Sequence, residues 1–120
     1  MMTLKDCYAA LGGDYEDVMG RLRSERLVQK FVLKFLDDKS YENLCCAMET
    51  GQQEEAFRAA HTIKGMCQNL SFTKLGESSE RITERLRGGD LAGAQPLLEG
   101  VQQDYARAVE AIRAFQAELG

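Results

Sequence analysis

Apolar residues recur at helical spacing along nearly the whole chain, and this periodicity restricts the fold more than any other feature. The clearest stretch lies near the C-terminus, where apolar residues are separated by alternating steps of three and four. These positions are Leu98, Val101, Tyr105, Ala108, Ile112, Phe115 and Leu119. No stretch alternates apolar and polar residues as a half-buried strand would. The pattern therefore predicts an all-α protein.

Glycines and capping residues divide the N-terminal half into helical segments. The first segment is interrupted at Gly12-Gly13, after which Asp14 is a suitable N-cap for a short helix. Ser24 is expected to cap the next segment, which carries a long apolar stripe. That stripe fits either one long helix or two helices that meet near residues 38–40.

The C-terminal half contains three more segments. Helices are predicted over about residues 53–70 and 73–87, and Asp90 is expected to cap the last segment. Because Pro96 has no backbone N–H, we expect a short turn over residues 91–95 and a new helix or a kink at Pro96. Four amphipathic helices with short connections predict an antiparallel up-down-up-down four-helix bundle with a short extra N-terminal helix.

Composition narrows the classes of function. A chain of 120 residues has the size of one domain, so residues 1–120 are expected to form a single domain. The apolar seams of the helices are sufficient to close one bundle, which favours a monomer. The net charge of −4 gives no support for nucleic-acid binding. No apolar run approaches the roughly 20 residues of a membrane span, and the N-terminus lacks the apolar core of a signal peptide. We therefore expect a cytoplasmic protein that does not bind membranes.

The cysteines are expected to be core thiols. Cys7, Cys45, Cys46 and Cys67 form no C-x-x-C pair, and the chain has one histidine. A zinc site normally needs closely spaced pairs of ligands, so no metal site is predicted. In a reducing compartment free thiols are favoured over disulfides.

The single histidine, His61, is predicted on the outer face of its helix. At about 100° per residue, the apolar positions of this segment fall within roughly 60° of Ile63. These positions are Ala56, Ala59, Ala60, Met66, Cys67 and Leu70. His61 lies about 160° from Ile63 and is expected to face solvent. An accessible neutral imidazole is a nucleophile near physiological pH.

Residues three or four positions from His61 share its face. Lys64 could stabilise a phosphoryl group on the imidazole, and Arg58 could add to that charge; either could equally be a solvated surface cation. Gly65 costs roughly 1 kcal/mol relative to alanine in a helix interior. That cost is explained if a side chain there would block a partner, or if Gly65 packs closely against another helix.

Two further residues complete the face. Phe57 could be a docking contact for a partner, or its ring could pack into a neighbouring groove. Gln68 could hydrogen-bond the imidazole or a phosphoryl group, or be an ordinary surface residue.

The run Ala60-His61-Thr62-Ile63-Lys64-Gly65, continuing to Asn69-Leu70, resembles the His-x-x-Lys-Gly signature of the histidine-containing phosphotransfer (HPt) family. The order of helical segments is similar over most of the chain. The resemblance implies that His61 accepts the phosphoryl group, that Lys64 assists it and that Gly65 leaves space for a receiver domain. Gln68 and Ser71 depart from the family pattern. Ser71 replaces a usual glycine and could cap the following helix.

The function implied is a phosphorelay carrier that accepts a phosphoryl group from a receiver-domain aspartate and passes it to another receiver. Its partners would be response-regulator receivers and a hybrid histidine kinase. Without a P-loop or a Gly-rich ATP motif, the chain is expected to be no enzyme of its own and to need no cofactor.

Two alternatives remain. One is a helical module that binds receivers without phosphotransfer, and the other is a phosphoacceptor domain labelled directly by an adjoining kinase. A hydrolase that uses His61 as a base is disfavoured, because no suitable partner shares its face and Glu54 lies two turns away.

Overall fold

The computed structural model describes residues 1–120 and contains helices and no strands, which confirms the all-α class. The seven helices are α1 (Leu4–Leu11), α2 (Tyr15–Leu22), α3 (Glu25–Phe35), α4 (Ser40–Glu49), α5 (Gln53–Leu70), α6 (Thr73–Arg87) and α7 (Leu91–Glu118). None of them is both long and apolar enough to cross a bilayer.

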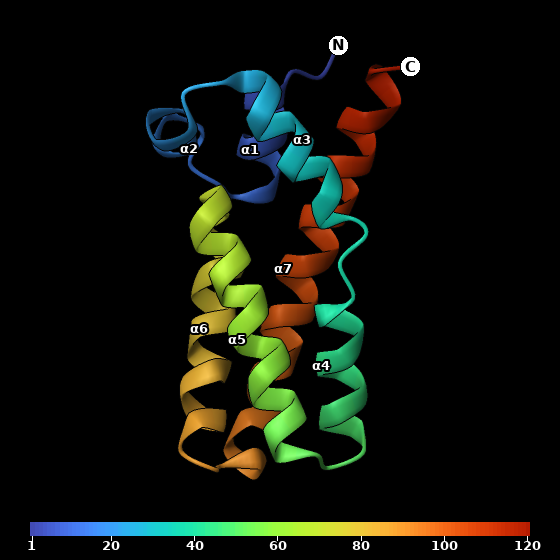
Figure 1. Cartoon of the computed structure of the whole chain (residues 1–120). Coiled ribbons are helices and arrows are strands. Elements are labelled where there is room, and N and C mark those ends of the chain that lie inside the picture. Colours follow the sequence, from blue (N-terminus) through green and yellow to red (C-terminus); the bar gives the residue numbers. More distant parts are fainter.

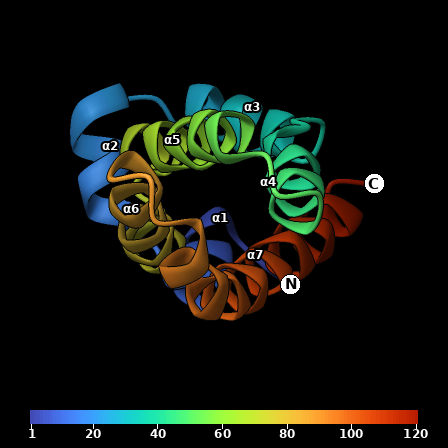
Figure 2. The same cartoon turned by 90° about the horizontal axis from the view of Figure 1, so that it is seen from below.

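Helices α4 to α7 lie side by side and enclose the core (Figures 1 and 2). α5 packs against α4 on one side and α6 on the other, and α6 packs against α7. Seen along the bundle, α7 lies across from α5 (Figure 2). Short connections at residues 50–52, 71–72 and 88–90 join these helices. The outer face of α5 is therefore left open between its two neighbours.

Three predicted caps are present. The Asp14 side chain accepts a hydrogen bond from the Asp17 N–H at 3.0 Å, and Ser24 accepts one from Leu27 at 3.1 Å. Asp90 accepts a hydrogen bond from the Gly93 N–H at 2.8 Å and so begins α7. Each cap satisfies a donor that the first helical turn leaves free.

The predicted break at Gly12-Gly13 is present, and of the two alternatives after Ser24 the pair of helices that meet near residues 38–40 is observed. Instead of one short extra helix there are three, α1 to α3, which gather at one end of the bundle (Figure 1). The apolar stripe after Ser24 is split into α3 and α4. The connection contains Asp38, whose carboxylate accepts a hydrogen bond from the Ser40 N–H at 2.7 Å. α1 packs against α7 and extends the core beyond the bundle of α4 to α7.

The predicted turn over residues 91–95 is wrong. α7 runs without interruption from Leu91 to Glu118 and contains Pro96 in its second turn. A proline at this position removes one backbone hydrogen bond near the helix start, where the Asp90 cap already holds the first turn. The end of the apolar seam also differs, because Leu119 is 48% exposed and lies beyond the helix.

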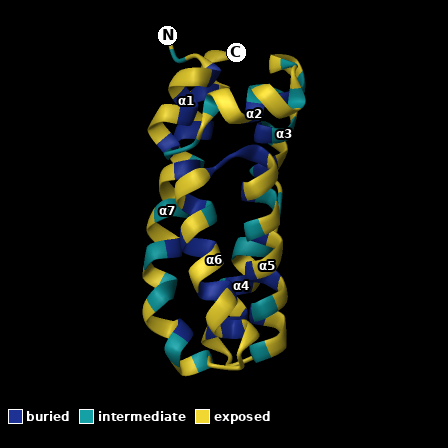
Figure 3. Cartoon of the chain, turned by 90° about the vertical axis from the view of Figure 1, so that its left-hand side faces the viewer, coloured by how far each residue is buried: buried dark blue, intermediate teal, exposed yellow.

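The core is one cluster of 27 buried hydrophobic residues that runs along the bundle (Figure 3). All four cysteines are free thiols. Cys7 and Cys67 are buried in this core, as predicted, whereas Cys45 is half-buried and Cys46 is exposed on α4. The expectation of core thiols is therefore wrong for Cys46.

Candidate functional site

The site is centred on His61 in the third turn of α5. The inward face of this helix is buried at Ala56, Ala59, Ala60, Ile63, Cys67 and Leu70, and Met66 is half-buried beside them. His61 lies on the opposite face and is exposed, which confirms its predicted orientation. Its imidazole stacks against the Phe57 ring, with 5.7 Å between centroids and 11° between planes.

Two cations flank the imidazole along the helix. Lys64 is half-buried and Arg58 is exposed, and neither takes part in any of the chain's ion pairs. The Arg58 carbonyl accepts a hydrogen bond from the Thr62 hydroxyl at 2.9 Å, a contact that leaves the guanidinium free. Both cations are therefore available to a negatively charged group that approaches His61.

Gly65 faces open space. A Cβ built on this residue would meet no atom within 4 Å, so the alternative that Gly65 packs against another helix is wrong. The close approach between α5 and α6 is made elsewhere, by Gly76, where an added Cβ would lie 3.3 Å from the Cβ of Cys67. Beside His61, the missing side chain leaves accessible space that no part of this chain fills.

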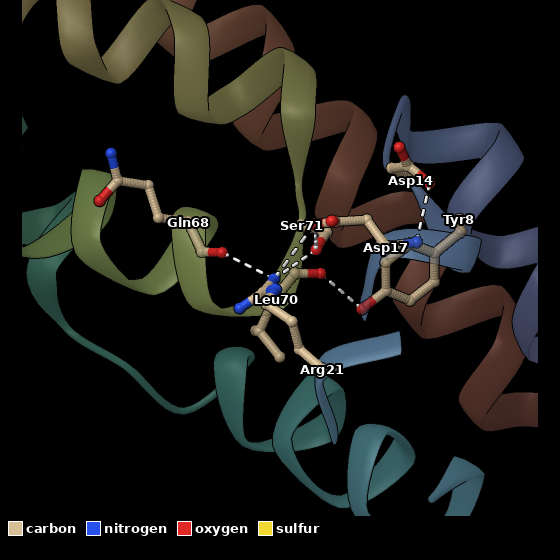
Figure 4. A network of polar contacts seen from close by, with 7 residues as sticks. All are labelled: Tyr8, Asp14, Asp17, Arg21, Gln68, Leu70 and Ser71. Atoms are coloured by element: carbon tan, nitrogen blue, oxygen red, sulfur yellow. Dashed lines mark hydrogen bonds and ion pairs between the residues drawn. The ribbon is translucent and has the colours of Figure 1, made fainter. Parts of the chain in front are cut away.

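The C-terminal end of α5 is fixed by contacts from α1 and α2 (Figure 4). The Tyr8 hydroxyl donates to the Leu70 carbonyl at 2.7 Å, and burial raises the pKa of this tyrosine. The Arg21 guanidinium donates to the Gln68 carbonyl at 2.8 Å. The Gln68 side chain itself is exposed and points away from this network (Figure 4). The structure shows no bond from Gln68 to the imidazole.

Ser71 does not cap α6, contrary to the prediction. It is the C-cap of α5 in the left-handed conformation, with φ of 57°, and Phe72 precedes α6 without a side-chain cap. The Ser71 hydroxyl donates to Asp17 at 2.6 Å and accepts from Arg21, while its carbonyl accepts from the Asp14 N–H at 2.8 Å. These contacts compensate for a backbone conformation that usually favours glycine.

One residue beside this face, Arg87, was not predicted from the sequence. Arg87, in the last turn of α6, places its guanidinium carbon 5.1 Å from the centroid of the Phe57 ring. Phe57 thus contacts a cation from α6 and the imidazole from its own helix. Only the register between α5 and α6 brings Arg87 here, and helical periodicity does not encode that register.

Comparison with known families decides the identity of the fold. The sequence model of the Hpt domain matches residues 16–114, which is most of the chain. The chain belongs to the Hpt domain family. No curated protein matches it, and no solved structure does either.

Membership of the Hpt family implies histidine phosphotransfer in two-component signalling. Hpt domains are phosphoryl carriers that interact with receiver domains and kinases, and they are not enzymes with an ATP site of their own. His61 is the only histidine in this chain, and it lies within the matched residues.

A groove of about 360 Å³ between α4 and α5 is lined by Arg58 and Thr62, but His61 does not line it. No group of three or more His, Cys, Asp or Glu side chains converges as a metal site. The imidazole is therefore presented on an open surface without protein metal ligands around it.

Proposed function

We propose that this Hpt domain accepts a phosphoryl group on His61 from the phosphoaspartate of one receiver domain and passes it to another. The observation that carries the proposal is the exposed imidazole of His61 with the open space at Gly65 beside it. The receiver's reactive aspartate must come within bonding distance of the imidazole. An exposed helix face with no side chain at position 65 permits that approach.

In the proposed step, a lone pair on one imidazole nitrogen of His61 attacks phosphorus in line with the acyl phosphate bond. The N–P bond forms as the O–P bond breaks, and the receiver carboxylate leaves with the electron pair. The same chemistry in the opposite direction then passes the phosphoryl group from His61 to the aspartate of a second receiver. Phosphoryl transfer depends mainly on positioning and charge neutralisation. We propose that the receiver supplies its metal ion for that purpose.

Lys64 and Arg58 are proposed to stabilise the dianionic phosphoryl group. Both are free of intramolecular ion pairs, so no internal contact must break before they turn towards it. Exposed ion pairs contribute about 0.2–1 kcal/mol in water, so Lys64→Gln should slow transfer by up to about fivefold. Arg58→Gln should have a smaller effect, because the Arg58 side chain lines the groove between α4 and α5, which His61 does not line.

The decisive test is transfer from a panel of phosphorylated receivers to the wild-type chain and to His61→Gln. We expect acid-labile, base-stable phosphate on the wild type and none on the variant. Because the side chain is exposed, His61→Gln should keep the wild-type helicity and melting temperature. Phosphate on the variant would place the acceptor elsewhere and refute the proposal.

Two further outcomes would select the alternatives. A chain that binds receivers without accepting phosphate is an interaction module. A chain that is labelled only by a histidine kinase with ATP is a kinase-proximal phosphoacceptor. For the proposed relay role we expect a monomeric unit that acts in the cytoplasm, where a receiver can cover the α5 face.

A further inference from the structure

The Phe57 ring contacts both the Arg87 guanidinium of α6 and the reactive imidazole of His61. Antiparallel packing brings the start of α5 beside the end of α6, since the two helices follow each other through a short connection. The Gln53 side-chain amide donates to the Leu86 carbonyl and fixes the register at this end. The Arg87 side chain therefore reaches the Phe57 ring from a neighbouring helix, independently of α5's own periodicity.

Arg87 is held in place on two sides. Its Nε lies 3.3 Å from the Glu84 carboxylate one turn back, and its guanidinium carbon lies over the Phe57 ring at 5.1 Å. A guanidinium over an aromatic face is attracted by the ring quadrupole. Because Phe57 is half-buried against the core, this contact restricts a ring that already has little freedom.

Phe57 in turn restricts the imidazole. His61 is exposed, and an exposed side chain ordinarily exchanges among its rotamers in picoseconds to nanoseconds. The nearly parallel Phe57 ring, 5.7 Å away, favours one of these orientations. In-line transfer requires the nitrogen lone pair to point along the bond that breaks, so a restricted ring begins closer to the reactive geometry.

We propose that Phe57 and Arg87 are positioning residues: Arg87 holds the Phe57 ring, and that ring holds the imidazole of His61 in the orientation used for transfer. The proposal rests on the proposed function for the transfer step, but the contact itself does not.

The first test is the NMR spectrum of the imidazole in the full chain. His61 is the only histidine, so its two ring C–H signals need no assignment by mutation. Phe57→Leu keeps apolar volume and removes the ring, and it should displace both signals and broaden the set of populated rotamers. Phe57→Tyr keeps the ring and should leave the signals nearly in place. Arg87→Gln should displace the imidazole signals in the same direction as Phe57→Leu, but by a smaller amount.

Arg85→Gln is the matched control. Arg85 lies in the same last turn of α6, but it pairs with Asp90 at 3.2 Å and is not a partner of the Phe57 ring. The imidazole signals should not move in this variant. Unmoved signals in Phe57→Leu, or equal displacement by Arg85→Gln and Arg87→Gln, would overturn the proposal.

The second test is transfer kinetics with a phosphorylated receiver. For this half-reaction, kcat is the maximal rate constant of transfer at saturating receiver, and KM is the receiver concentration that gives half of it. Loss of an aromatic contact of this kind should lower kcat by about three- to tenfold in Phe57→Leu, with KM unchanged and with Phe57→Tyr restoring the rate. A higher KM with unchanged kcat would overturn the positioning role and make Phe57 a docking contact. If the wild type accepts phosphate from no receiver, the proposed function fails, and the imidazole spectra still decide whether the two residues hold the ring.

Discussion

Replacement of Gly65 by alanine should make the chain more stable and less active. Gly65 lies in the interior of α5, and an added Cβ would meet no atom within 4 Å. Alanine is about 0.8–1 kcal/mol more favourable than glycine in a helix interior, and no contact in this structure opposes that gain. The free energy of unfolding should therefore rise by about 0.5–1 kcal/mol. For a chain of this length the melting temperature should rise by about 2–6 °C.

Transfer should change in the opposite direction. Position 65 follows His61 by four residues, so its side chain would lie beside the imidazole on the same face. A methyl group would leave the receiver less space to approach the imidazole, and a larger side chain would block that approach. We expect transfer to be slower in Gly65→Ala than in the wild type and to be lost in Gly65→Leu. Circular dichroism should show unchanged helicity in both variants.

Gly100→Ala separates the two effects. Gly100 lies inside α7, where an added Cβ also meets nothing within 4 Å, and α7 lies across the bundle from α5 (Figure 2). This variant should gain the same stability and transfer phosphate at the wild-type rate. A destabilised Gly65→Ala would refute the interpretation that position 65 is open. Normal transfer by Gly65→Leu would show that the space is not needed.

Three other predictions concern stability and thiol chemistry. Ser71→Ala removes the hydroxyl that donates to Asp17 at 2.6 Å and should cost about 1 kcal/mol in urea denaturation; an unchanged midpoint would contradict this. Burial raises the pKa of the Cys7 and Cys67 thiols from 9.0 to about 11 and about 12, so above pH 9 thiolates form in the unfolded chain before they form in the folded one. The free energy of unfolding should be flat below pH 8 and fall above pH 9 by about 1.4 kcal/mol per pH unit for each thiol, and a flat profile to pH 10 would disprove it. Cys46 is exposed and should react first with a maleimide, whereas Cys7 and Cys67 should react only after unfolding; mass spectrometry of the labelled chain would detect any other order.

Local pattern was sufficient to predict much of the fold. The bounds of α5 and α6 agree with the predicted ranges, because Gly88-Gly89 and the apolar spacing mark the ends of these helices in the sequence itself. The inward face of α5 was also predicted correctly, except that Met66 is only half-buried. Met66 lines a groove of about 320 Å³ with Phe31, where α3 does not fully cover α5.

The errors have a shared physical cause. Pro96 was expected to start a new helix or a kink after a turn over residues 91–95, because its missing N–H is a strictly local cost. In the folded chain one lost hydrogen bond is small beside the burial of Ala94 and Val101 on the same helix. Ser71 was likewise interpreted from its own side chain, yet its conformation is stabilised by Asp17 and Arg21, residues about 50 positions away. Tertiary contacts override the local preference in both places.

The same reasoning explains which part of the site the sequence could reveal. His61, Lys64 and Gly65 lie on one helix, so their common face follows from a period of 3.6 residues. Arg87 reaches that face only because the turn after α5 and the core between α5 and α6 fix how far one helix is displaced along the other. A contact of this kind depends on packing between two helices, so the periodicity of one helix does not predict it. In an Hpt domain, a residue of a neighbouring helix can therefore position the histidine through an aromatic side chain that lies beside it. Here Phe57 of α5 is that aromatic side chain, and Arg87 of α6 contacts it.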